Sequence, residues 1–197
     1  MNLLEQMKTR RSIRKYRTER VEREKLDMIV EAGLYAPNAG ARQAAKIIMI
    51  DDPELIERIG VINAACEKRN WASGVSEEQP SIIDDLSIKS GFYSCTALGI
   101  VCIPEKNKGA VNAIGTGFCA AENMVLEAYD LGVSSCIVGR AEATFNHPEM
   151  KGLPGEWGLD PEYTPLVFVC LGYIEGNYPA VKARKEGRSL FIPRQED

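Results

Sequence analysis

The stretch Arg10-Arg11-Ser12-Ile13-Arg14-Lys15-Tyr16-Arg17 places five cationic side chains within eight residues of a chain whose formal net charge is −4. A dense positive segment on an acidic protein indicates a fixed anionic ligand, because proteins that track nucleic acid are basic over a broad surface. Arginine suits phosphate, since its planar fork donates two parallel hydrogen bonds and stays charged. A solvated basic turn is the plain alternative. Nucleic acid is not an expected partner.

The composition of the chain is that of an ordinary globular protein. Of its 197 residues, 45% are hydrophobic and 26% are charged, and we expect a single domain over residues 1–197. No apolar run approaches the ~20 residues that cross a bilayer. Residues 1–6 lack the basic-then-apolar layout of a signal peptide. The sequence therefore predicts a cytoplasmic protein without a membrane partner.

Metal chemistry is not expected. No two of the six cysteines lie closer than seven positions, and most of them lie within apolar strings. Such cysteines are typical of small buried side chains in a reducing compartment. The single histidine, His147, precedes Pro148 in a polar turn. Histidine triads and multi-histidine metal sites therefore lack their ligands.

Hydrophobic periodicity predicts alternating helices and strands. Asp52-Pro53-Glu54 marks a helix start, since Asp caps, Pro suits the first helical position and Glu favours the first turn. Helices are expected over residues 2–8, 22–34, 52–66 and 112–131, strands over 46–50, 96–103, 133–138 and 165–172, and one helical turn over 146–151. This alternation taken alone predicts an open α/β domain.

Two segments lack clear periodicity. Residues 70–91 mix acids, Ser and Gly with scattered Ile and Leu, and both a lid over a site and a plain surface loop fit this composition. Residues 173–197 are polar and partly basic, with Leu190-Phe191-Ile192 as a late apolar patch. That tail cannot pack on itself, so it must lie on the domain or on another subunit.

Three further clusters are candidates for a binding site. Pro37-Asn38-Ala39-Gly40-Ala41-Arg42-Gln43 follows a helix, and its small residues let the backbone approach a flat ligand. Val138-Gly139-Arg140 ends a predicted strand, and Lys182-Ala183-Arg184 places two cations in the tail. Each cluster also has a structural explanation. Residues 37–43 could be an ordinary helix-to-strand turn, residues 138–140 a strand-terminating turn, and residues 182–184 part of a solvated tail.

The order of the motifs is informative. Arg10-Arg11-Ser12-x-Arg14-x-Tyr16 is followed by Ala36-Pro37-Asn38-Ala39-Gly40-x-Arg42-Gln43, by Ala120-Ala121-Glu122-Asn123-Met124 leading to Leu131-Gly132-Val133, and by Lys182-x-Arg184. In this order the chain, from about residue 3 to 192, resembles the FMN-dependent nitroreductase family. The resemblance implies an α+β, nitroreductase-like fold with a largely antiparallel central sheet, helices on both faces and a C-terminal tail that wraps the dimer partner. We therefore expect the antiparallel α+β topology that the resemblance implies, rather than the open α/β domain that periodicity alone predicts.

The resemblance also implies roles for the matching residues. Arg10, Ser12 and Arg14 would hold the FMN phosphate and ribityl end with help from Arg11, and Lys182 and Arg184 would close the phosphate from the other side. Val138 and Gly139 would place a backbone N–H near flavin N5. In the homodimer that the resemblance implies, Pro37, Asn38, Ala39 and Gly40, with Gln43 beside them, would reach the flavin bound mainly by the other subunit.

Three positions depart from the family pattern. Ala44-Ala45 follow Gln43, where many members have an aromatic residue or Pro-Trp. Val138 stands where many members have Glu, so only a backbone contact carries over. The polar residues that touch the flavin pyrimidine ring have no clear match, and the candidates are Asn63, Lys68 and Asn70.

The implied activity is an NAD(P)H-dependent oxidoreductase. A hydride would pass from NAD(P)H to flavin N5 and on to a nitroaromatic, a quinone or a similar electron-poor small molecule by a ping-pong route. The flavin carries this chemistry, so no side-chain acid or nucleophile is required. The alternatives are a flavin carrier or ligand-sensing module, and a specialised member that performs reductive dehalogenation or flavin cleavage.

A competing motif is Gly115-Thr116-Gly117-Phe118-Cys119-Ala120, which matches the GxGxxA pattern of dinucleotide-binding turns. The preceding predicted strand ends about ten residues too early, and the strand over 133–138 carries no acidic residue. We therefore interpret these glycines as sites of close helix packing.

Overall fold

The sheet is antiparallel throughout. The computed structural model describes residues 2–68, 89–104 and 110–194. Four strands, β1 (Lys46–Ile50), β2 (Ala97–Pro104), β3 (Ser134–Val138) and β4 (Tyr163–Gly172), pair in the order β1-β2-β4-β3. Each neighbouring pair is antiparallel. The α+β prediction is confirmed, and the open α/β arrangement that alternation alone predicted is wrong.

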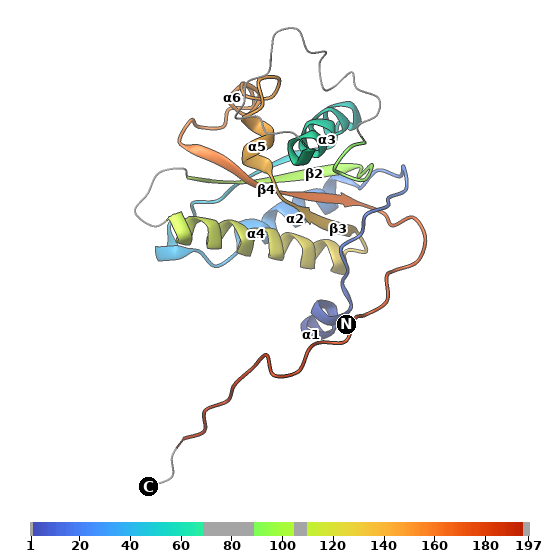
Figure 1. The fold of residues 1–197 in the computed structure, drawn as a ribbon, viewed down its shortest axis with the longest axis vertical. Coiled ribbons are helices and arrows are strands. Elements are labelled where there is room, and N and C mark those ends of the chain that lie inside the picture. The colour runs from blue at the N-terminus through green and yellow to red at the C-terminus, as the bar shows by residue number, and fades with distance from the viewer. Residues whose placement is uncertain (1, 69–88, 105–109, 195–197) are drawn as a thin grey trace.

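The position of strand β4 explains why the alternation of helices and strands predicted the wrong topology. Strands β2 and β3 both run antiparallel to β4, so they run parallel to each other. They are joined by helix α4 (Ala110–Asp130), as in a parallel crossover unit. The last strand of the chain then inserts between them (Figure 1). Local periodicity cannot show this insertion.

Both faces of the sheet are buried. Leu98 and Ile100 of β2 and Phe168 of β4 face helices α3 (Pro53–Lys68) and α5 (Ala141–Phe145). Their neighbours Val101 and Val169 face α2 (Arg23–Leu34) and α4. Figure 1 shows these helix pairs on opposite sides of the sheet. Burial on both faces removes the polar alternation of an exposed strand, which is why β2 and β4 read as continuous apolar runs.

Gly117 sets the distance between α4 and the sheet. A Cβ at this position would lie 2.4 Å from Leu166 Cδ2 and 2.9 Å from Ile103 Cγ2. Gly115 has open space around the corresponding position. Both glycines lie inside α4, well after its start at Ala110. The packing interpretation is therefore confirmed for Gly117, and the dinucleotide-binding turn has no strand directly before it.

The start of β4 and the segment over residues 146–151 differ from the prediction in an informative way. Strand β4 begins at Tyr163 rather than Pro165, because a register shift between Val101 and Cys102 lets β2 pair past the proline. Residues 146–151 form a turn with one helical hydrogen bond, from Lys151 N to His147 O at 2.9 Å. The short helices α5 and α6 (Leu153–Glu156) lie on either side of it. Helices of five and four residues are too short to show periodicity.

The N-terminal segment and the start of the C-terminal tail lie together beside β3. Helix α1 (Leu3–Thr9) packs near the end of α4, and the C-terminal tail runs past it and leaves the body (Figure 1). Residues 175–194 are exposed throughout. Leu190, Phe191 and Ile192 are 95%, 90% and 90% exposed. The tail therefore has no core of its own in a single chain, as the sequence predicted. No described helix is long and apolar enough to cross a membrane.

Candidate functional site

The arginine segment lies along the free edge of β3. Ile13 N donates to Ser135 O at 2.9 Å, and Ser12 and Ser135 form a parallel bridge. Ile13 and Tyr16 are 2% and 5% exposed, so these two apolar side chains hold the segment in the core. Tyr16 Oη donates to Ile13 O at 2.7 Å, and burial raises the pKa of its phenol. The backbone is thereby fixed, and the polar side chains between the anchors are held in place.

Arg10, Ser12 and Arg14 all lie near Cys136 of β3. Burial raises the pKa of the Cys136 thiol, while Arg14, a hydrogen bond with Ser12, and Arg10 each act to lower it. The same proximity to Cys136 is the largest cause that raises the pKa of Arg14. Alternate residues of an extended segment share one side. The structure therefore places three residues predicted to bind phosphate near the middle residue of β3.

Two donors of this segment are buried without a hydrogen-bond partner among the described residues. They are Arg10 Nε and Arg11 Nη2. On the adjacent strand, Ser135 Oγ is likewise buried without a hydrogen-bond partner in the described part of the chain. A buried donor without a partner costs about 1–3 kcal/mol, so donors gathered in this way mark a place for an acceptor. Arg11 has a second task, since its Nη1 donates to the carbonyl oxygens of Lys8, at 2.8 Å, and Arg10.

A buried asparagine supports the turn after β3. Asn63 Nδ2 donates to Gly139 O and to Thr144 Oγ1, both at 3.0 Å, and Asn63 Oδ1 accepts from Arg140 Nη2 at 3.2 Å. Arg140 begins α5 in the left-handed conformation, with φ of 67°. Gly139 is exposed at the end of the strand, while the side chain of Val138 is 7% exposed. The Val138 side chain therefore faces the core, and the exposed group at this turn is the backbone of Gly139.

The prediction that Asn63 is a candidate for contact with the flavin ring is wrong. Asn63 has no exposed surface, and its amide is used within the chain. Its neighbours Ile59 and Ile62 are completely buried on the same side of α3, and this spacing could have marked it as inward-facing. The side chain of Lys68 and all of Asn70 lie outside the described residues, as does most of the segment expected to form a lid or loop.

The loop from Pro37 to Gln43 is held in an irregular conformation. Asn38 Oδ1 accepts from Gln43 N at 2.8 Å, and Ala39 N donates to Thr116 Oγ1 at 3.4 Å. Gly40 and Gln43 have φ of 64° and 50°, and such left-handed residues favour close approach of backbone to a ligand. A hollow of about 140 Å³ lies between this loop and α4, with Asn38, Gln43 and Thr116 among its lining residues.

The loop and the arginine segment lie at opposite ends of α4. Thr116, which contacts the loop, is 13 positions before Tyr129, whose hydroxyl donates to Thr9 Oγ1 at 3.0 Å. At 1.5 Å per residue these contacts are roughly 20 Å apart. The structure of one chain thus separates two groups of residues that were predicted to meet the same ligand.

The two tail cations lie in exposed, extended chain. Lys182 and Arg184 belong to the segment that leaves the body past α1 (Figure 1). The structure therefore does not test whether they approach the arginine segment.

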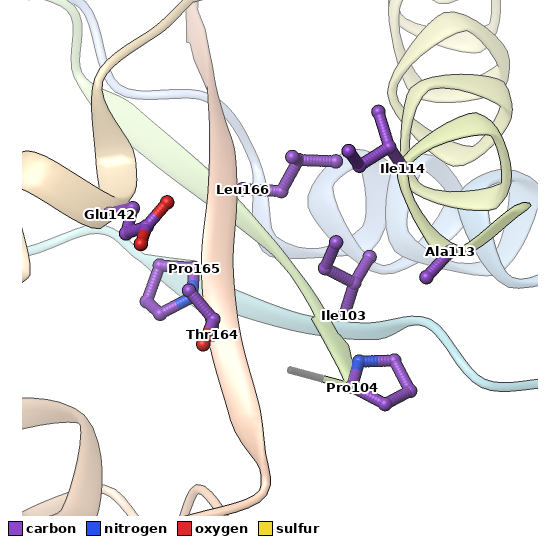
Figure 2. A pocket seen from close by; sticks show the side chains of 8 residues that line it. All are labelled: Ile103, Pro104, Ala113, Ile114, Glu142, Thr164, Pro165 and Leu166. Carbon is purple, nitrogen blue, oxygen red and sulfur yellow. The ribbon is translucent and has the colours of Figure 1, made fainter. Parts of the chain in front are cut away.

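A second hollow lies beyond the end of β3, between the start of β4 and the start of α4. Figure 2 shows its walls, in which Ile103, Ile114 and Leu166 are apolar and Glu142 is the charged residue. Its volume is about 190 Å³. Glu142 follows Gly139 by three residues. Sites for small molecules are largely apolar with few polar groups and usually measure about 300–1,000 Å³, so this hollow has room for only part of such a molecule. Among the described residues no group of His, Cys, Asp or Glu could hold a metal ion.

Comparison with known proteins identifies the family of the chain. The model of the Nitroreductase family matches residues 7–173. A protein of Methanothermobacter thermautotrophicus named as an NADH dehydrogenase/NAD(P)H nitroreductase is 39% identical over 173 residues, which cover 88% of this chain and 78% of that protein. A nitroreductase with bound FMN from Bacteroides fragilis superposes with a TM-score of 0.80 at 26% identity, over 98% of this chain and 100% of the other.

A further solved structure supports the fold alone. The nitroreductase from Desulfitobacterium hafniense superposes with a TM-score of 0.78 at 22% identity, over 98% of this chain and 100% of that one. Since the family model extends from the arginine segment to the end of β4, the chain belongs to the nitroreductase family.

Proposed function

We propose that this protein is an FMN-dependent oxidoreductase that takes electrons from NAD(P)H and passes them to an electron-poor small molecule. The observation that carries the proposal is that Arg10, Ser12 and Arg14 all lie near Cys136 of β3, with a buried guanidinium donor that has no partner among the described residues. The family and the 26% identical relative with bound FMN support the identity of the ligand.

The residues fit a phosphate. Arg10 Nε and Arg11 Nη2 are donors in need of an acceptor, and Ser12 adds a hydroxyl between two cations. A unit charge close to phosphate near a protein surface interacts at roughly 4 kcal/mol before desolvation is subtracted. Two arginines and a serine therefore fit the phosphate end of a mononucleotide.

The spacing along β3 fits the rest of the cofactor. Gly139 lies three residues after Cys136, about 10 Å along the strand at ~3.3 Å per residue, and Cys136 marks the position of the three phosphate residues. Phosphate at the middle of β3 therefore leaves the backbone of Gly139 to meet the ring. The hollow beside Glu142 begins where the strand ends. When bound, FMN supplies transfer of a hydride at N5 from NAD(P)H to a nitroaromatic, a quinone or a similar acceptor.

The chain itself supplies position and shape. Asn63 holds the carbonyl of Gly139 and the first turn of α5, so the backbone that would face N5 has little freedom to move. A fixed group at a reacting centre lowers the entropic cost of the reaction. No side chain near the strand end is required to donate or accept a proton.

We also propose that the working form is a homodimer. Within one chain the Pro37–Gln43 loop is roughly 20 Å from the arginine segment along α4, and this separation favours contact of the loop with an FMN that is bound by another copy. Ile114 and Phe118 are 44% and 45% exposed on one face of α4, close to this loop. Exposed apolar side chains in such a group favour burial against a partner. The exposed tail would wrap the same partner.

A spectroscopic titration tests the proposed activity. We expect the purified protein to be yellow, to lose its flavin absorbance near 450 nm on anaerobic addition of NADPH or NADH, as oxidised flavin does on reduction, and to regain it when a quinone or nitroaromatic is added. Protein that stays yellow with both nicotinamides would be a flavin carrier or sensor, and the oxidoreductase proposal would be wrong. Protein that binds no FMN would contradict both.

A further inference from the structure

The first six residues of the tail are tied to the arginine segment and to β3. Arg17 N donates to Tyr173 O at 2.8 Å, and Glu175 N donates to Lys15 O at 3.0 Å. Tyr16 and Ile174 form an antiparallel bridge. These contacts fix the tail as far as Glu175, at the C-terminal end of the arginine segment.

Tyr178 ties the tail a second time, at the other end of that segment. Its hydroxyl shares a hydrogen bond of 3.0 Å with Ser134 Oγ, and Ser134 is 2% exposed at the first position of β3. Its ring packs edge-on against Tyr129, with 6.1 Å between centroids and 72° between planes. Tyr129 in turn donates to Thr9, the residue before Arg10. The cluster of Thr9, Tyr129, Ser134 and Tyr178 thus joins the N-terminal segment, α4, β3 and the tail.

This anchor limits where the tail cations can go. Lys182 follows Tyr178 by four residues, so its Cα lies within about 14 Å of the anchor when the chain is fully extended. Without Tyr178 the nearest fixed residue is Glu175, seven residues away, and the limit rises to about 24 Å. The volume open to Lys182 then grows roughly fivefold by this limit, or about twofold if the tail is a flexible coil.

We infer that Tyr178 is a positioning residue for the cofactor phosphate, because it holds the start of the tail and so limits how far Lys182 and Arg184 can move from the arginine segment. The inference rests on the proposed binding of FMN and on the phosphate contact that the family resemblance implies for Lys182 and Arg184. Tyr178 would raise the effective concentration of Lys182 and Arg184 near the phosphate, without contacting the phosphate itself. Replacing Tyr178 should therefore weaken the binding only of ligands that carry the phosphate.

The test compares FMN with riboflavin, which has the same ring and ribityl chain but no phosphate. Both are titrated into the full-length apoprotein, with quenching of flavin fluorescence as the readout. For Tyr178→Ala we expect the Kd for FMN to rise about two- to fivefold and the Kd for riboflavin to stay unchanged. Tyr178→Phe keeps the ring contact with Tyr129 and should recover part of the loss. Val181→Ala, at a 65% exposed tail position, is the matched control and should bind both as the wild type does.

A second comparison separates positioning from a general loss of structure. In a protein that already carries Lys182→Ala and Arg184→Ala, Tyr178→Ala should cause no further loss of FMN affinity, since the cations it positions are gone. Equal weakening of FMN and riboflavin would overturn the inference, and so would an unchanged FMN affinity in Tyr178→Ala. Failure of the wild-type protein to bind FMN more tightly than riboflavin would overturn the proposed phosphate site itself, and the inference with it.

Discussion

Replacing Arg10 and Arg14 together by alanine is expected to yield a folded but colourless protein. Each charge-assisted hydrogen bond to a phosphate contributes roughly 1.5–3 kcal/mol, so the double substitution should weaken FMN binding at least a hundredfold, at about 1.4 kcal/mol per factor of ten. The fold should survive, because Ile13 and Tyr16, and not the arginines, hold this segment in the core. The flavin-to-protein absorbance ratio measures the loss, and circular dichroism and thermal unfolding check the fold.

A matched variant controls for net charge. Arg20→Ala with Arg23→Ala removes the same two charges from exposed positions outside the cluster, and it should keep its flavin. Full flavin content in the Arg10/Arg14 double variant would refute the phosphate role of the segment. Equal loss in both double variants would mean that overall charge, rather than the cluster, governs binding.

Truncation after Gly172 is expected to have the second-largest effect. It removes Lys182 and Arg184, the pairing of residues 173–175 with the arginine segment, and the exposed apolar group Leu190, Phe191 and Ile192. The product should be a monomer or an aggregate without FMN. The arginine segment loses its pairing with residues 173–175, and the apolar tail residues no longer cover the partner subunit. Sedimentation velocity and the absorbance spectrum report the two losses separately.

A shorter truncation is the control for this experiment. Ending the chain at Arg194 removes only residues 195–197, and the product should keep both its flavin and its oligomeric state. A stable, flavin-loaded monomer from the truncation after Gly172 would contradict the role given to the tail.

The strands could be predicted well because the sheet is buried on both faces. Continuous apolar runs placed β2 and β3 to within one residue, and only the start of β4 moved, by two residues. Their order in the sheet could not be read from the same runs, because nothing local to β4 shows that it inserts between β2 and β3. The antiparallel topology followed from the resemblance to the nitroreductases instead.

The candidate site was predictable only in part. The spacing of Arg10, Ser12 and Arg14 in one extended segment is visible in the sequence, and the structure brings these three residues together. Asn63 was a candidate for contact with the flavin ring because it is polar, but its buried amide donates to the carbonyl of Gly139 after β3 instead. Tyr178 was missed because its partners Ser134 and Tyr129 lie more than 40 positions away in the chain, and the sequence gives no signal of such a contact.

A crystal structure grown with saturating FMN tests the central claim most directly. The account predicts one phosphate beside β3, within hydrogen-bonding distance of Arg10, Ser12 and Arg14, with Lys182 and Arg184 closing over it and the Pro37–Gln43 loop of a second copy against the ring. Guanidinium groups turned into solvent, with the phosphate bound elsewhere, would contradict it.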